Sequence, residues 1–349
     1  MAKKLAVVLM NLGGPESLET VRPFLFNLFS DPAIFRLPQP FRSLLAALVA
    51  KRRTKVAVEI YRAIGGSSPL LTNTEAQARA VEAELAGDRD VRVFVAMRYW
   101  HPFTIETVRQ VQDWGADEVV LLPLYPQFST TTTASSLAEW ERAAWFLRFA
   151  VPTSSVCCYP EEPGFISAMA AGIARELDEA ERHGRPRLLL SAHGLPERVV
   201  AAGDPYRFQC TLTAAAIVKA LGRPELDWVL CYQSRVGPMK WIGPSTDSEV
   251  ARAGGDRVPV VIAPIAFVSE HSETLFEIEI EYRKQAADAG VPYFTRVPAV
   301  GADPRFIAAL ARLVRAALGA QAKIFSGSDS RICPASCKAC LLKSAAGTG

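Results

Sequence analysis

Two short stretches of the chain carry side chains that could move protons or bind a metal ion. In the first, His193 ends the apolar run Leu188-Leu-Leu-Ser-Ala192 and is followed by Gly194 and Pro196, so we expect it at the carboxyl end of a buried strand. Open α/β sheets bind their ligands at that end. Imidazole, with an ordinary pKa of about 6.5, can serve as a base or as a metal ligand. An isolated histidine is more often structural, so the interpretation depends on the rest of the chain.

The second stretch, residues 267–282, is dense in acidic side chains. Its titratable residues are Glu270, His271, Glu273, Glu277, Glu279 and Glu281. Glu273, Glu277 and Glu281 recur at every fourth position and share one helix face, while the residues between them are largely apolar. This pattern indicates an embedded helix with a path for protons or cations; a solvated acidic face is the alternative. His271 and Glu273 would diverge by about 200° on an α-helix, so both reach one pocket only at a helix entry or a π-type bulge.

Alternating strand and helix patterns are expected to position these residues, as in α/β proteins. Strands are predicted at residues 5–10, 91–96, 119–124, 155–159, 187–192, 228–232 and 260–266, and helices at 16–29, 104–114 and 136–149. Val119-Val-Leu-Leu-Pro-Leu124 resembles Val260-Val-Ile-Ala-Pro-Ile265, and Met10 to Pro15 takes the place of Ala192 to Pro196. The sequence therefore predicts two similar Rossmann-like domains, each with a doubly wound parallel sheet, and an active site in the cleft between them. Chance likeness between buried strands is the alternative.

The predicted division places residues 1–160 in the first domain, 161–318 in the second and 319–349 in a C-terminal extension. Within the first domain, residues 24–53 are apolar and end in the basic run Lys51-Arg-Arg53. We call this segment the lip. Beside a cleft it could face substrate or an anionic membrane surface. An ordinary packed helix pair is equally compatible with its pattern.

Composition restricts the function further. The 349 residues include 39 basic and 36 acidic side chains, a net charge of +3, which excludes a nucleic-acid footprint. Without an apolar run of about 18 residues, no transmembrane helix is expected. The amino terminus lacks a signal-peptide cleavage site, so we expect a cytoplasmic protein. Seven cysteines in a reducing compartment indicate thiols or a metal site.

Six motifs, taken together and in order, resemble the ferrochelatase family over about residues 5–318. They are Asn11-Leu-Gly-Gly-Pro15, Arg98-Tyr-Trp-His-Pro102, Tyr125-Pro-Gln-Phe-Ser129, Ser191-Ala-His-Gly-Leu-Pro196, the segment from Gln233 to Pro244, and the segment from Pro264 to Leu275. The resemblance implies two Rossmann-like domains around an active-site cleft. It also implies insertion of Fe2+, as substrate, into protoporphyrin IX with release of two protons.

The resemblance assigns roles residue by residue. His193 becomes the base or metal-delivery residue, with Glu273 as its acidic partner and His271 beside it. Glu277 and Glu281 match an acidic line that leads away from the pocket through locally π-helical backbone. The porphyrin-binding positions are Phe35, Arg98, Tyr99, Ser129 and Trp241; Arg98 and Ser129 meet propionates or stabilise the loop.

The cysteines of the tail have the spacing Cys333-x3-Cys337-x2-Cys340. Many ferrochelatases hold a [2Fe-2S] cluster by three C-terminal cysteines and an internal one. Thr130 stands where the animal pattern has that internal cysteine, so the animal pattern fails here. The internal candidates are Cys157, Cys158, Cys210 and Cys231, and the last two are expected in the core. The resemblance to bacterial members with a later ligand implies Cys158, with Cys157 as the other choice. Zinc and an empty tail are the alternatives.

Other functions remain open at this point. Coproporphyrin III, which has two more carboxylates than protoporphyrin IX, could be the substrate. The chain could insert Co2+ or Ni2+ into another tetrapyrrole, or it could be a haem-binding protein without activity. The acidic line counts against a haem carrier, because finished haem needs no proton path. Peripheral membrane binding is expected from the lip, and the oligomeric state is open.

Overall fold

The chain folds into two compact units in this computed structural model, which describes residues 3–87, 89–235, 237, 239–320, 323–328 and 330–342. One unit comprises Met1–Cys158 and Leu310–Ser326, and the other comprises Tyr159–Ala309 and Gly327–Gly349. The chain therefore leaves the first unit, returns to it and leaves it again. The division drawn from the sequence instead gives residues 319–349 to an extension; here strand β9 (Ile324–Ser326) pairs with β4 in the first sheet.

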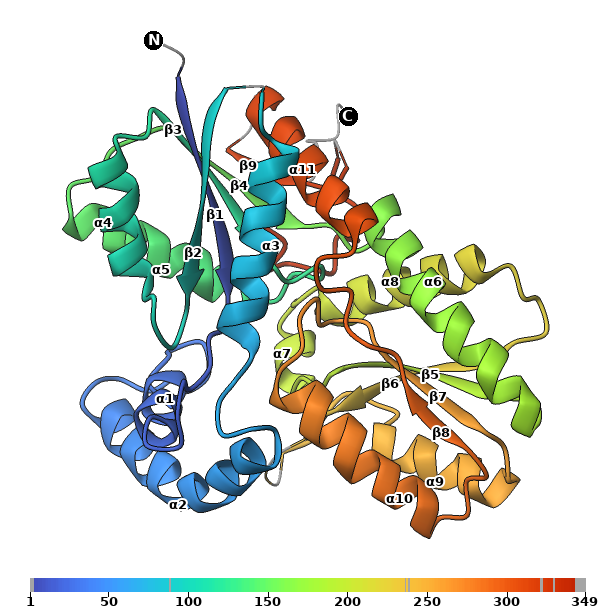
Figure 1. Ribbon diagram of the computed structural model, residues 1–349. Coiled ribbons are helices and arrows are strands. Elements are labelled where there is room, and N and C mark those ends of the chain that lie inside the picture. The colour runs from blue at the N-terminus through green and yellow to red at the C-terminus, as the bar shows by residue number, and fades with distance from the viewer. Residues whose placement is uncertain are drawn as a thin grey trace. The chain divides into compact units, whose positions relative to one another are not determined.

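The first unit is built on a parallel sheet with strand order β2-β1-β3-β4-β9. Its other strands are β1 (Lys4–Asn11), β2 (Asp90–Met97), β3 (Glu118–Pro123) and β4 (Thr153–Cys158). Helix α3 (Leu70–Glu84) and the end of α11 (Pro304–Gly319) cover one face, and α4 (Thr104–Trp114) and α5 (Thr133–Phe146) cover the other (Figure 1). Because both faces are covered, the strands are apolar runs rather than alternating patterns.

The lip forms two helices, α1 (Val21–Phe29) and α2 (Phe41–Ala63). Their inner sides pack in one apolar cluster that includes Val21, Phe24, Leu25, Ala50, Tyr61, Tyr99 and Trp100. The outer side of α2 leaves Phe41 66%, Leu44 72% and Leu48 45% exposed. The lip is therefore a packed helix pair that also presents apolar side chains to solvent. No helix in the described ranges has the length and apolar character to cross a bilayer.

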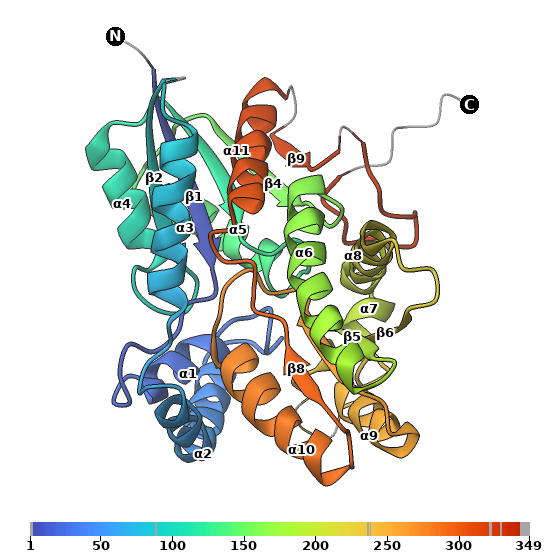
Figure 2. The same cartoon turned by 45° about the vertical axis from the view of Figure 1, so that its right-hand side comes forward.

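The second unit has a parallel sheet with strand order β6-β5-β7-β8. The strands are β5 (Arg187–His193), β6 (Asp227–Gln233), β7 (Val260–Pro264) and β8 (Phe294–Arg296). Helices α6 (Pro163–Ala180) and α8 (Tyr206–Leu221) cover one face, and α9 (Thr246–Asp256), the π-helix η2 (Glu273–Tyr282) and α10 (Arg283–Asp288) cover the other (Figure 2). The short helices η1 (Glu181–His183) and α7 (Glu197–Ala201) lie in connections.

The first four strands of each sheet have the same spatial order: second, first, third, fourth. Asn11 at the end of β1 and His193 at the end of β5 therefore occupy equivalent places. This confirms the predicted pair of Rossmann-like parallel-sheet domains.

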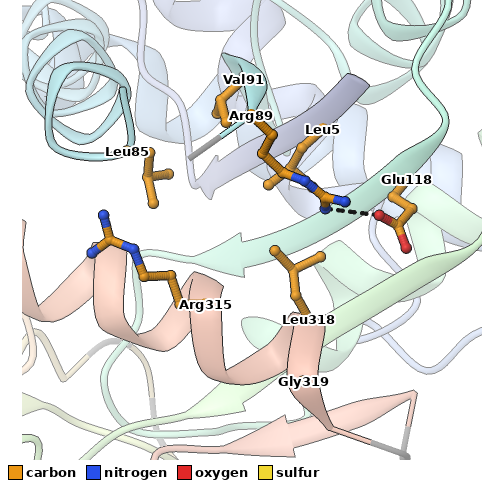
Figure 3. A pocket seen from close by; sticks show the side chains of 8 residues that line it. All are labelled: Leu5, Leu85, Arg89, Val91, Glu118, Arg315, Leu318 and Gly319. Atoms are coloured by element: carbon orange, nitrogen blue, oxygen red, sulfur yellow. Dashed lines mark hydrogen bonds and ion pairs between the residues drawn. The ribbon is translucent and has the colours of Figure 1, made fainter. Parts of the chain in front are cut away.

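A cavity of about 340 Å³ opens at the amino ends of β1, β2 and β3 in the first unit. Leu5, Leu85, Arg89, Val91, Glu118, Arg315, Leu318 and Gly319 line it (Figure 3). This edge of the sheet is opposite to the carboxyl ends, and none of the predicted site residues lines the cavity.

Candidate active site

His193 is the last residue of β5, where the strand register pairs it with Gln233 of β6. Its Nδ1–H donates to the carbonyl oxygen of Gly194 at 2.7 Å, which leaves Nε2 to face Glu273. Gly194 is required here because a Cβ atom would lie 2.8 Å from the Gln233 carbonyl oxygen and 3.3 Å from the Trp241 ring. Close packing thus requires glycine at position 194, and the hydrogen bond to its carbonyl fixes the orientation of the imidazole.

The Glu273 carboxylate lies between two imidazoles. Its Oε1 is 3.5 Å from His193 Nε2, and its Oε2 is 3.6 Å from His271 Nε2. His271 is 8% exposed, and the Phe267 ring stacks edge-on against it at 4.5 Å between centroids. The structure thus brings together the three predicted catalytic residues, from the end of β5 and the start of η2.

His271 and Glu273 converge at a helix entry, one of the two arrangements that the sequence left as choices: His271 precedes the helix, and Glu273 is the first residue of the π-helix η2. The π-helix runs for ten residues, from Glu273 to Tyr282, and is longer than a single bulge. Thr274, Ile278 and Tyr282 form its buried side. Glu273 and Glu277 are partly buried on another side, and Glu281 is exposed. The three carboxylates therefore follow the helix from the histidine pair toward solvent.

Glu277 is held by four hydrogen bonds, which sequence analysis did not anticipate. Ser234 donates its backbone N–H to Oε1 at 2.7 Å and its hydroxyl to Oε2 at 2.5 Å. The Gln233 amide donates to Oε2 at 3.1 Å, and the Tyr282 hydroxyl donates to Oε1 at 3.0 Å. Ser234 reaches this geometry in the left-handed region, with φ 60°. A non-glycine residue there is uncommon and is typical of functional sites.

The charges in this pocket perturb one another. Burial opposes a charged His193, but the Glu273 carboxylate and the Gly194 carbonyl outweigh it and raise the pKa of His193 to about 9. Burial also opposes a charged Glu273, yet His193 and His271 lower its pKa to about 2. The pKa of His271 is lowered, chiefly by burial. An imidazolium–carboxylate pair between His193 and Glu273 is the form favoured at neutral pH.

The next carboxylates along the line take up protons more readily. Burial and the charge of Glu273 raise the pKa of Glu277, against the hydrogen bonds from Ser234 and Gln233. Burial and the charge of Glu277 raise the pKa of Glu281. Proton affinity along η2 therefore increases beyond Glu273.

Glu270 and Glu279, the other acidic residues of this stretch, are engaged by arginines. Arg296 of β8 binds Glu270 at 2.8 Å and Glu279 at 3.1 Å, and Arg283 binds Glu279 at 2.5 Å. Arg296 thereby connects residues on both sides of Glu273 and Glu277. Because Glu270 and Glu279 form these ion pairs, the acidic line along η2 consists of Glu273, Glu277 and Glu281.

The predicted porphyrin-binding residues are divided between the two units. Phe35, Arg98, Tyr99 and Ser129 belong to the first unit, and Trp241 belongs to the second. Trp241 packs against Gly194, beside His193; Val236 and Pro238 of the same motif lie outside the described residues. Ser129 is 1% exposed and hydrogen-bonds to Thr131 within its loop, at 2.9 Å between the hydroxyl oxygens, which favours the loop-stabilising role.

Arg98 and Tyr99 share a buried partner that sequence analysis missed. Asp31 accepts from the Tyr99 hydroxyl at 2.6 Å and forms an ion pair with the Arg98 guanidinium at 2.9 Å. The only sequence signal for Asp31 is an aspartate before a proline, which is typical of a turn. Its long-range partners are 67 and 68 positions away in sequence, so no local pattern reveals them.

The cysteine tail is an ordered loop in the second unit. The Arg331 guanidinium donates to the carbonyls of Cys333, Pro334, Cys337 and Leu342. The loop docks on Gly203, whose carbonyl accepts from the Ala339 N–H at 3.1 Å. Cys333 and Cys337 are buried. Over the described ranges, however, no three His, Cys, Asp or Glu side chains are gathered so as to hold a metal ion, so the [2Fe-2S] cluster stays a prediction.

The two candidates for the internal ligand lie at the end of β4. A bulge between Val156 and Cys158 interrupts the register of β4 with β9. Side chains of consecutive strand residues normally point to opposite faces, but here the Cys157 and Cys158 sulfurs are only 3.4 Å apart. Both thiols are buried.

Comparisons with known proteins show the family to which the chain is similar. The ferrochelatase family model matches residues 4–318. A ferrochelatase from Hyphomonas neptunium is 52% identical over 97% of this chain and 95% of its own length. One from Caulobacter vibrioides is 54% identical over 91% of this chain and 92% of its own. Among solved structures, SirB from Bacillus subtilis with Fe3+ has a TM-score of 0.53 at 14% identity, covering 90% of this chain and 94% of that one, which shows a shared fold.

Proposed function

The chain belongs to the ferrochelatase family, enzymes that insert ferrous iron into a porphyrin, and we propose that its porphyrin is protoporphyrin IX. The observation that carries the assignment of the site is the pair His193–Glu273 at 3.5 Å, continued by Glu277 and Glu281 along η2. The Glu273 carboxylate can attract a dication, and a base beside a line of carboxylates can remove protons; metal insertion requires both. Family membership favours iron insertion over cobalt or nickel insertion and over haem delivery.

The proposed chemistry balances charge. Two pyrrole N–H protons leave the macrocycle as Fe2+ enters, so the core of the product stays neutral. In the resting pair, His193 holds a proton because Glu273 is beside it. A dication that arrives at Glu273 neutralises the carboxylate that stabilises the imidazolium, and so lowers the pKa of His193. The imidazole then gives up its own proton and can accept one from a pyrrole nitrogen.

Protons leave the pocket along the carboxylates of η2. Glu277 and Glu281 each have a raised pKa, so each can hold a proton at a higher pH than an ordinary glutamate. Ser234 fixes Glu277 through two donors and Tyr282 through a third. We place the exit at Glu281, which is exposed.

An anaerobic assay with Fe2+ and each porphyrin tests the function directly. We expect metallation of protoporphyrin IX, followed by the loss of porphyrin fluorescence and the appearance of the haem spectrum. Faster metallation of coproporphyrin III than of protoporphyrin IX would show that coproporphyrin III is the substrate. Insertion of Co2+ but not Fe2+ under the same conditions would contradict the proposal.

We further propose that Cys158, Cys333, Cys337 and Cys340 hold a [2Fe-2S] cluster. Thiolates are the ligands that such clusters take. Three of the four lie within eight residues on one ordered loop, which keeps the loop-closure entropy low. The Cys340 backbone N–H donates to the Cys337 carbonyl at 3.1 Å, so these two residues share one turn of the loop. The cluster has no step in metal insertion.

Cysteine substitutions separate the two internal candidates. We expect the purified protein to be brown with about two irons and two sulfides per chain, and Cys158→Ser to lose both colour and iron. Cys157→Ser is the matched control, because it removes the adjacent buried thiol, and it should keep the cluster. A colourless protein that carries zinc would contradict the cluster, and a brown Cys158→Ser protein would contradict the ligand.

We also propose that the protein is cytoplasmic and binds membrane surfaces peripherally through the lip. The outer side of α2 exposes Phe41, Leu44 and Leu48, and the exposed Lys51 and Arg52 lie on the same helix. Apolar side chains with adjacent cations are typical of helices that lie on anionic bilayers. Such a surface would suit a poorly soluble porphyrin substrate.

Sedimentation with anionic liposomes measures this interaction. We expect binding at low salt that weakens at higher ionic strength, because the cationic contribution is screened. Replacing Phe41, Leu44 and Leu48 by serine should weaken binding by roughly tenfold or more, since their burial in the interface contributes on the order of several kcal/mol. Trp145→Ser is the matched control: Trp145 is 81% exposed, but on α5. An equal loss of liposome binding in the control, or no binding at low salt, would show that the lip does not bind membranes.

A further inference from the structure

Asp31 is a buried residue whose hydrogen bonds connect the lip with the loop after β2. It lies between α1 and α2 and is 3% exposed. Its Oδ1 accepts the Ala33 N–H at 2.8 Å, and its backbone carbonyl accepts the N–H of Phe35 at 3.0 Å. These bonds form the turn that carries Phe35, one of the predicted porphyrin contacts.

The second carboxylate oxygen of Asp31 collects three donors. Tyr99 donates its hydroxyl at 2.6 Å, Ser135 donates its hydroxyl at 2.5 Å, and the Arg98 guanidinium pairs with it at 2.9 Å. Arg98 also donates from Nε to the Ser135 hydroxyl at 2.8 Å and lies 4.9 Å from the centre of the Tyr99 ring. Arg98 is therefore fixed in place by a closed network.

The pairing changes what Arg98 can do at a porphyrin. Its side chain is 16% exposed, whereas that of Asp31 is 1% exposed, so the cation can reach a ligand while its counter-charge lies behind it. Within the described part of the chain, Asp31 is the carboxylate that pairs with Arg98. Arg98 thus offers N–H donors to a ligand, but the pair as a whole carries no net charge.

We propose that Asp31 determines porphyrin selectivity by cancelling the charge of Arg98. This inference rests on the proposed function, because it takes Arg98 to lie at the porphyrin. Protoporphyrin IX has two propionates and coproporphyrin III has four. A pocket with one fewer net positive charge favours the porphyrin with fewer carboxylates, since the additional anions would remain without counter-charge. Asp31 is accordingly a specificity residue that does not itself contact substrate.

Asp31→Asn provides the test, because asparagine keeps the shape and one acceptor oxygen but removes the charge. The ratio of kcat/KM for coproporphyrin III over protoporphyrin IX should rise on the order of tenfold, as for one unit charge about 10 Å from a carboxylate in partly screened surroundings. The change should appear mainly in KM and should shrink as salt is added. Arg98→Gln leaves Asp31 unpaired, so the ratio should move in the opposite direction.

Two controls separate charge from structure. Ser135→Ala removes a hydrogen bond from the same oxygen without changing any charge, and it should leave the ratio within about twofold. In the Asp31→Asn/Arg98→Gln double variant the ratio should return toward that of the wild type. An unchanged ratio in a folded Asp31→Asn protein, or an equal change in Ser135→Ala, would overturn the inference while the function stands. A wild-type protein that metallates neither porphyrin would instead refute the proposed function.

Discussion

The His193→Ala protein is expected to bind porphyrin and to metallate it roughly a hundred to ten thousand times more slowly than the wild type, the range over which a positioned base contributes to rate. The imidazole ends β5, and its Nδ1–H is fixed on the Gly194 carbonyl, so Nε2 is the nitrogen that can act as the base. Its removal leaves the Trp241 ring against Gly194, and porphyrin affinity should change only a few-fold.

Porphyrin fluorescence quenching measures binding, and anaerobic turnover measures insertion, so the two effects separate cleanly. His183→Ala is a suitable control because His183 stacks on Tyr293 at 4.2 Å and contacts none of the site residues. Turnover within a few-fold of the wild type in His193→Ala would remove the residue from catalysis. A parallel loss of binding and turnover would make His193 a substrate contact and not a base.

Glu273→Gln is expected to be nearly as severe, because the variant lacks the carboxylate at which the dication arrives, and it should change the pH dependence as well. The Glu273 carboxylate is the main group that raises the pKa of His193, against burial, which lowers it. With a neutral amide in its place, the pKa of His193 falls. A base must be unprotonated to act, so activity rises as pH passes through that pKa. The rising limb of kcat/KM, which reports the free enzyme, should therefore lie above pH 6.5 in the wild type and move to lower pH in the variant.

Comparison within the same helix sharpens this experiment. Glu277→Gln should reduce turnover less, because Glu277 acts after His193 in the proton line and the glutamine oxygen can still accept from the Ser234 N–H and the Tyr282 hydroxyl, which both bind Oε1. Glu279→Gln removes the same charge from η2, at a residue that binds Arg283 and Arg296, and serves as the matched control. Equal rates and pH profiles for Glu273→Gln and the wild type would reduce the acidic line to a solvated surface.

The sequence was sufficient to predict the position of residues that depend on local patterns. His193 follows an apolar run and precedes Gly194, and the structure places it at the end of β5. The likeness between the strands at Val119 and Val260 was confirmed, because β3 and β7 are the third strands of two sheets with one order. The helix predicted over residues 16–29 was too long at its start, since α1 begins at Val21.

Other features depend on contacts that no local pattern encodes. The π-helix η2 packs Ile278 and Tyr282 against the second sheet for ten residues, and a period of four could not distinguish it from an α-helix. The left-handed backbone of Ser234 comes from its bonds to Glu277, 43 positions later. Asp31 joins Tyr99 and Ser135 across comparable separations. These residues determine the charge of the site, and each needed the tertiary structure to be found.

The pairing of β9 with β4 has a consequence for how the protein is made. Residues 324–326 come late in the chain, so on the ribosome the first 158 residues emerge long before the strand that completes their sheet. Until then, the nascent domain exposes β4 as an open edge, with its hydrogen-bonding groups and two thiols beside it. Nascent edges of this kind recruit chaperones or pair with other chains. Premature termination before residue 324 should therefore yield an aggregating fragment, even though every residue assigned to metal insertion would be present.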